Sequence, residues 1–151
     1  MRFQTVADVL NVVKDFHASL ARQFAELEQL TTSERAQLML DYLNRHEQNL
    51  ARATEQFSSD ASPGLMNTWL QLAPETHPEN LLEKVRNVDL NDVDSIVAVA
   101  LEVDDYLVSL YGEVAAHADT DEAKEVFLNL VKLEDNERHT LSRAAFRLND
   151  M

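Results

Sequence analysis

Four stretches of the chain carry apolar side chains spaced three or four residues apart, and this spacing constrains the fold more than any other feature. The first stretch covers about residues 5–30, and its apolar stripe is Val9, Val13, Phe16, Leu20, Phe24 and Leu27. The same spacing predicts helices over about 33–57, 91–116 and 121–148. Only 2 glycines and 3 prolines occur among 151 residues, so few positions interrupt a long helix. No long run alternates with period two, so strands are not expected and we predict an all-α protein.

The lengths of the connections predict how the four helices are arranged. The short links before about residue 33 and before about residue 121 make the helices on either side of each link antiparallel neighbours. The link over 58–90 is long enough to return along the bundle, so it makes the second and third helices parallel. Short helical pieces are expected within this crossover, one over 65–72 around Trp69 and one over 78–86, where Pro78 favours a first turn. We therefore predict a four-helix bundle of two antiparallel hairpins joined by a long crossover.

Composition limits the kinds of protein that the chain can be. Its length suits one domain, 1–151, with one core. The net charge of −14 disfavours binding to nucleic acid or to an anionic membrane. The absence of cysteine excludes disulfides, thiolate catalysis and Cys-ligated zinc or iron–sulfur centres. We see no apolar signal region at the N-terminus and no segment of transmembrane character, so a cytoplasmic protein is expected. Nothing identifies a small-molecule substrate.

Five ionisable residues lie on the predicted apolar stripes, where they are out of place. They are His17, His46, Asp104, Glu134 and Glu137. Charged groups are rarely fully buried unless they are paired or bound to a metal. If the four helices pack as one bundle, these side chains meet in its core. They are the candidate site.

The two predicted hairpins repeat each other. His17 is followed seven residues later by Phe24, and Asp104 is followed seven residues later by Tyr111. A spacing of four and then three residues recurs in Met39, Leu43 and His46 and in Leu130, Glu134 and Glu137. Helical periodicity alone explains the apolar matches, but it does not explain ionisable residues at equivalent positions of both hairpins. The repeat therefore favours a shared ancestral site.

With this repeat the chain resembles the ferritin-like superfamily, and within it the rubrerythrin-type bundles. Members of that family typically carry Glu on the first helix, Glu-x-x-His on the second, Glu on the third and Glu-x-x-His on the fourth, and these ligands hold two metal ions. The resemblance covers the four long predicted helices. It implies a ferritin-like bundle with a metal site in the core.

The ligand positions that the resemblance implies are only partly of the family type. His46 and Glu134 match the family pattern, and Asp104 is a shorter carboxylate at the position of a Glu. Three positions carry other residues, namely His17, Leu43 and Glu137. A shifted register would place His139 at the missing histidine, but helical periodicity puts His139 on the surface. The resemblance therefore implies an altered ligand set, without the carboxylate that usually bridges two metals.

The candidate residues have a metal chemistry of their own. His17, His46 and Glu134 would form a set of two histidines and one carboxylate, which can hold Fe(II) with open positions for oxygen or substrate. Mn and Zn are alternatives for the same donors. Asp104 and Glu137 could hold a second ion of harder character.

Two functions remain open on the sequence. The first is a ferritin-like protein with an altered, mononuclear metal site, which would be a metal-dependent oxidoreductase if it is active. The second is a non-catalytic helical interaction or scaffold protein that holds no metal, in which the two histidines pair with the acids. Iron storage is a third idea, and it requires a closed shell of many subunits. Apolar residues in the crossover favour a homodimer, for which Trp69 is one candidate contact.

Overall fold

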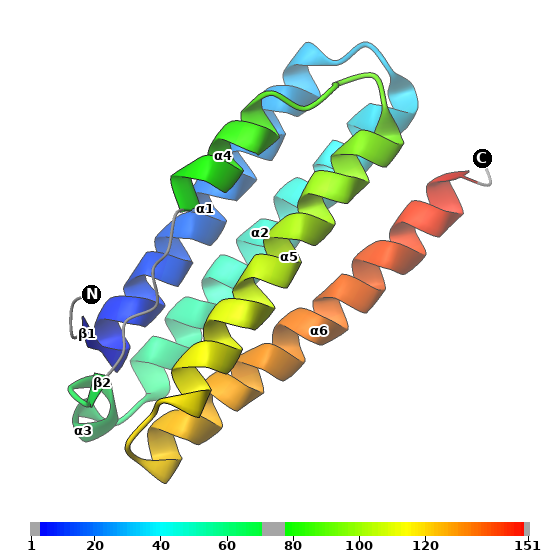
Figure 1. Ribbon diagram of the computed structural model, residues 1–151. Coiled ribbons are helices and arrows are strands. Elements are labelled where there is room, and N and C mark those ends of the chain that lie inside the picture. The colour runs from blue at the N-terminus through cyan, green and yellow to red at the C-terminus, as the bar shows by residue number, and fades with distance from the viewer. Residues whose placement is uncertain (1–3, 71–77, 150–151) are drawn as a thin grey trace.

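The computed structural model describes residues 4–70 and 78–149, and long helices dominate them (Figure 1). The four long helices are α1 (Val6–Leu30), α2 (Glu34–Asp60), α5 (Val93–Ala116) and α6 (Asp121–Asn149). The all-α prediction is thereby confirmed. The helix bounds lie close to those that the apolar spacing predicts, and the largest difference is at the end of α2, which reaches Asp60 and not only Phe57.

Side-chain caps explain where three of these helices begin. The hydroxyl of Thr5 accepts a hydrogen bond from the backbone N–H of Asp8, and the Asp8 carboxylate accepts one from the N–H of Thr5. This reciprocal pair satisfies two N–H groups that a helix leaves unpaired at its start. Ser33 caps α2 through its hydroxyl, and Asp92 caps α5 through its carboxylate. The caps fix where the first turns begin, and hence which side chains of each helix face the core.

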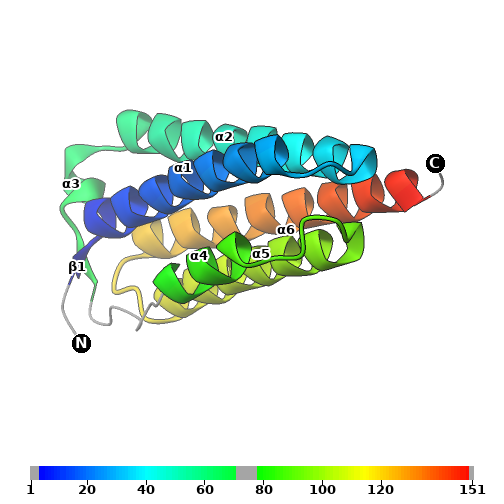
Figure 2. The same cartoon turned by 90° about the horizontal axis from the view of Figure 1, so that it is seen from above.

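The helices form two hairpins that lie against each other. In Figure 1, α1 and α2 run side by side in opposite directions, and so do α5 and α6. Both α2 and α5 run from the top of that view to the bottom. The crossover between them carries α3 (Pro63–Met66) and α4 (Pro78–Arg86), and α4 packs against α1 and α5 (Figure 2). The crossover thus returns the chain to the end of the bundle from which α2 started.

The crossover differs from the prediction around Trp69. Of the helix predicted over 65–72, Leu65 and Met66 are helical, at the end of α3. Trp69 and Leu70 instead form a short strand, β2, which pairs antiparallel with β1 (Gln4–Thr5). The prediction of a helix is therefore wrong at Trp69, and this pair of strands is not expected from the sequence. Gln4 and Thr5 are extended before α1 begins, and β2 pairs with them across a long sequence separation. Leu70 is buried and Trp69 exposed, as alternation along a strand requires. Residue 72, the predicted end of that helix, lies outside the described residues. The predicted helix over 78–86 is α4.

Side chains from all four long helices fill the interior. The largest that are fully buried include Phe24, Leu40, Leu43, Leu107, Tyr111, Phe127 and Leu141. None of the helices within residues 4–70 and 78–149 is long and apolar enough to cross a membrane. Outside the middle of the bundle the core is apolar except for the buried threonines Thr31 and Thr54, but five buried ionisable side chains interrupt it in the middle: His17, His46, Glu47, Asp104 and Glu134.

Candidate metal centre

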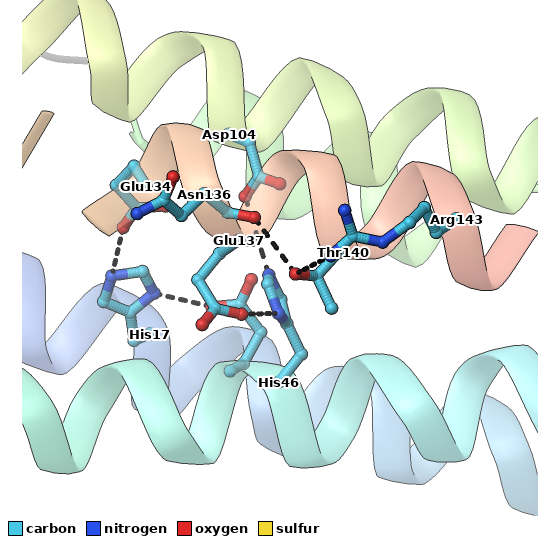
Figure 3. Close-up of polar contacts among 9 residues, drawn as sticks. His17, His46, Asp104, Glu134, Asn136, Glu137, Thr140 and Arg143 are labelled. Atoms are coloured by element: carbon cyan, nitrogen blue, oxygen red, sulfur yellow. Dashed lines mark hydrogen bonds and ion pairs between the residues drawn. The ribbon is translucent and has the colours of Figure 1, made fainter. Parts of the chain in front are cut away.

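The five residues predicted from the sequence all meet in the middle of the bundle (Figure 3). His17 comes from α1, His46 from α2, Asp104 from α5, and Glu134 and Glu137 from α6. Four of them are buried, whereas the side chain of Glu137 is 34% exposed. Glu137 is therefore the member of the group that reaches solvent.

The structure adds a sixth residue, Glu47, which the sequence reasoning missed. Glu47 is 2% exposed, and its Oε2 lies 2.6 Å from Nδ1 of His17. The predicted apolar stripe of α2 runs through Met39, Leu43 and His46 and does not include Glu47. Yet Leu40 and Thr54, seven residues before and after Glu47, are both buried. A core-facing stripe that is two residues wide, as in most bundle helices, would have included Glu47.

His17 lies between two carboxylates. Its Nδ1 hydrogen-bonds Glu47, and its Nε2 lies 3.2 Å from Oε1 of Glu134. Nε2 has no hydrogen-bond partner, so this second contact is an ion pair without the alignment of a hydrogen bond. Burial by itself would lower the pKa of His17, but the charge of Glu47 and then the contacts with Glu134 outweigh it and raise the pKa to about 10. Without a metal, His17 is therefore a buried cation at neutral pH.

His46 has a corresponding position between two other carboxylates. Its Nδ1 lies 3.1 Å from Oε2 of Glu137, and its Nε2 lies 3.9 Å from Oδ1 of Asp104. The ring of Tyr42 stacks on the imidazole, with 5.9 Å between ring centroids. Burial would lower the pKa of His46, but Asp104 and Glu137 outweigh it and raise the pKa to about 10.

The carboxylates respond to burial in different ways. Burial raises the pKa of Asp104 and of Glu134, because the attraction of the nearby histidines only partly offsets the loss of water. The pKa of the half-exposed Glu137 is lowered, chiefly by its interaction with His46. With Glu47, the site holds four carboxylates against two histidines, and these acids outnumber the cations even when both rings are protonated. A bound cation would offset this excess of negative charge.

Several buried atoms of the site have no hydrogen-bond partner. They are Nε2 of His17, Nε2 of His46, Oδ2 of Asp104 and Oε2 of Glu134. An unpaired polar atom in a core typically costs about 1–3 kcal/mol. So many unpaired donor and acceptor atoms in one place are unusual for a structural core, and those on His46 and Asp104 are of the kind that bind a metal ion.

One group of three side chains has the spacing of a metal site. His46, Glu47 and Asp104 each offer a ligand atom, and these atoms lie within 4.8 Å of one another. Two of the unpaired atoms, on His46 and Asp104, belong to this group. One imidazole and two carboxylates suit Fe, Mn or Zn. The residues present therefore fit a metal ion, with a centre that differs from the predicted trio, because His17 and Glu134 form an ion pair beside it.

Two further positions define the limits of the site. Leu43, where the family resemblance implies a Glu, is fully buried and cannot bind a metal. Glu47 lies one helical turn after it and supplies a carboxylate from the same helix. His139 is on the surface as predicted, with a side chain 65% exposed and its Nδ1 2.7 Å from the carbonyl oxygen of Asp135.

Comparison with known proteins leaves the site to be interpreted from its own geometry. Neither a scan against protein-family models nor searches of curated proteins and of solved structures find a significant match to the chain.

Proposed function

We propose that this chain is a ferritin-like protein whose bundle core binds a divalent metal ion through His46, Glu47 and Asp104. Fe is the first candidate, with Mn and Zn as alternatives for these donors. The observation that carries the proposal is the buried group of three ligand atoms within 4.8 Å of one another, two of whose residues carry unpaired atoms.

The surrounding residues support this assignment. His17 contacts the carboxylate of Glu47 at 2.6 Å, and such a contact would hold a ligand in its binding orientation. Glu137 contacts His46 and is partly exposed, so it lies where an ion would pass from solvent to the core. Fe or Mn bound there would supply one-electron redox chemistry, and Zn would supply a Lewis acid. The protein's own contribution would be to hold the donors in place and to keep most of the site away from water.

The ferritin-like part of the proposal rests on the order of the elements and on the position of the acids. Two hairpins joined by a long crossover, with α2 and α5 running in the same direction, are what the resemblance implies. His46 and Glu134 keep the residue types of the family pattern. Because Leu43 cannot bridge two ions and Glu47 lies one turn away, we propose a single ion at an altered site.

A metal-free scaffold is the second candidate, and one observation favours it. Each histidine already lies between two carboxylates, with a pKa of about 10, so ion pairs form without a metal. Buried ion pairs add little net stability, but a cluster of them can persist as the remnant of an older site. In that case the protein would act through its surface.

Metal content after reconstitution decides between these functions. The protein would be purified without a histidine tag, stripped with a chelator, incubated with Fe(II), Mn(II) or Zn(II), desalted and analysed by elemental mass spectrometry. We expect about one ion per chain for at least one metal, and we expect His46→Ala to lose it. His139→Ala is the matched control, since His139 is an exposed histidine. A chain that retains none of the three metals would establish the scaffold, and unchanged binding by His46→Ala would place the ion elsewhere.

A further inference from the structure

The outward face of α6 carries two exposed apolar side chains. Leu128 is 43% exposed and Phe146 is 69% exposed. They are 18 residues apart, which is five helical turns, so both lie on the same side of the helix. The opposite side faces the core through residues such as Glu134 and Leu141, and α6 lies at one edge of the bundle in Figure 1.

The two ends of this face have opposite charge. On the first turns of α6 the exposed acids Asp121, Glu122 and Glu125 outnumber the one exposed lysine there, Lys124, and on the last turns Arg143 and Arg147 are exposed. The chain as a whole has a net charge of −14, so two neighbouring arginines stand out from its surface. The face is thus acidic at one end and basic at the other.

A shallow hollow lies at the basic end. The residues that line it are His139, Ser142, Arg143, Phe146 and Arg147. Phe146 gives the hollow an apolar wall, and the arginine side chains flank it. The hollow suits an apolar side chain that has acidic residues beside it. Leu128 and Glu125, toward the other end of the same helix, provide this combination.

We propose that this face of α6 binds the same face of a second copy of the chain, with the two helices antiparallel. A twofold axis makes the contact self-complementary, because the acidic end of each copy then meets the basic end of the other, and the same contact occurs twice. Leu128 and Phe146 are placed symmetrically about Glu137, and Glu125 and Arg143 are placed symmetrically about Glu134. These two centres differ by less than one turn, so a single axis near the middle of α6 seats Leu128 in the hollow of the partner and brings the acidic end against the basic end.

Other exposed apolar residues lack this self-complementarity. Trp69 is 63% exposed on β2, and Leu30 is 68% exposed at the end of α1. Trp69 has no counterpart on β2 that a twofold axis would bring against it. Leu30 has one in Val12, which is 44% exposed and lies 18 residues earlier on α1. However, exposed acids lie near both ends of α1, at Asp8 and Glu26, so α1 lacks the opposite charges of the two ends of α6. The α6 surface is therefore a better site for a homodimer than the crossover that the sequence favours.

The mass of the protein in solution tests the pairing. In sedimentation equilibrium the chain should be a dimer that dissociates as NaCl is raised, because salt screens the contacts between the charged ends. Phe146→Ser should shift the protein to monomer. Leu30→Ser is the matched control, since Leu30 is as exposed as Phe146, and it should leave the dimer intact. A wild-type monomer at all concentrations, or a dimer that only Trp69→Ser dissociates, would overturn the proposal.

A charge exchange tests the antiparallel direction. Arg143→Glu with Arg147→Glu should dissociate the dimer, and adding Glu122→Arg and Glu125→Arg in the same chain should restore it, because each end then again meets its opposite. The absence of cysteine allows a second test by crosslinking. The exposed Asn136 lies near the proposed axis, so Asn136→Cys should form a disulfide with its own copy, and Asn129→Cys should not. Crosslinking by both variants, or failure of the exchanged charges to restore the dimer, contradicts this arrangement.

Discussion

Nδ1 of His17 and Oε2 of Glu47 lie 2.6 Å apart in the middle of the bundle, and they join the two helices of the first hairpin. Glu47 is also within reach of His46 and Asp104, so it links the ion pair of His17 and Glu134 to the group of candidate ligands. Glu47, which is not among the residues predicted from the sequence, thus connects the two halves of the site. The expectations below follow from this arrangement.

Removal of the charge of Glu47 should weaken metal binding. Glu47→Gln keeps the shape of the side chain but makes it a poor ligand, so we expect at least a tenfold loss of affinity, as measured by competition with a coloured chelator. Glu55→Gln on the exposed side of α2 is the control and should bind normally. Equal affinity in the two variants would exclude Glu47 as a ligand.

Asp104→Asn should have opposite effects on stability and on binding. Burial raises the pKa of Asp104, so its charged form destabilises the metal-free core, and a neutral amide relieves that cost. We expect a higher Tm for the chelated protein together with weaker metal binding. Asp105→Asn is the neighbouring control, because Asp105 is exposed and pairs with Arg138. A lower Tm for metal-free Asp104→Asn would show that the acid is stabilising without a metal.

The stability of the chelated protein should fall as the pH rises through neutrality. The pKa of His17 and of His46 is about 10 in the folded protein, against 6.5 as the ordinary value. The stabilisation from their positive charges is therefore complete below pH 6.5 and is lost as the pH approaches 10. The raised pKa values of Asp104 and Glu134 act in the same direction.

Urea unfolding of the chelated protein at a series of pH values measures this dependence. The midpoint should decrease from pH 6.5 to pH 10, and His46→Gln should decrease less over the same interval. Below pH 5 the lowered pKa of Glu137 has the opposite sign, so part of the stability should be lost again as that group is protonated. A midpoint that rises between pH 6.5 and 10 is incompatible with two buried imidazolium ions.

Two phenylalanines of α6 should differ in their contribution to stability. Phe127 is fully buried, and Phe127→Ala should cost about 3–5 kcal/mol in the free energy of unfolding. Phe146 is 69% exposed, and Phe146→Ala should change the stability of the monomer by less than about 0.5 kcal/mol. Urea unfolding at high salt, where the proposed dimer is dissociated, gives both values. A large cost at Phe146 under these conditions would mean that it packs within its own chain.

The sequence predicted the long helices well because their apolar spacing repeats over many turns and their caps are local. The same periodicity selected His17, His46 and Asp104, whose burial needed only the assumption of a single core. Glu47 was missed because a narrow stripe excludes a charged residue beside His46, and only the buried Leu40 and Thr54 show how wide the stripe is. β2 could not be predicted, because its pairing partner is β1, which lies near the N-terminus and far from β2 in the sequence.

The position of a bound ion tests the central claim most directly. A crystal of the reconstituted protein, with data collected at the absorption edge of the metal, should show an anomalous peak in the middle of the bundle. We expect that peak at about 2.0–2.2 Å from a ring nitrogen of His46 and from carboxylate oxygens of Glu47 and Asp104. A fully soaked crystal with no peak in the core, or with peaks only at exposed carboxylates, would contradict the claim that this bundle holds a metal.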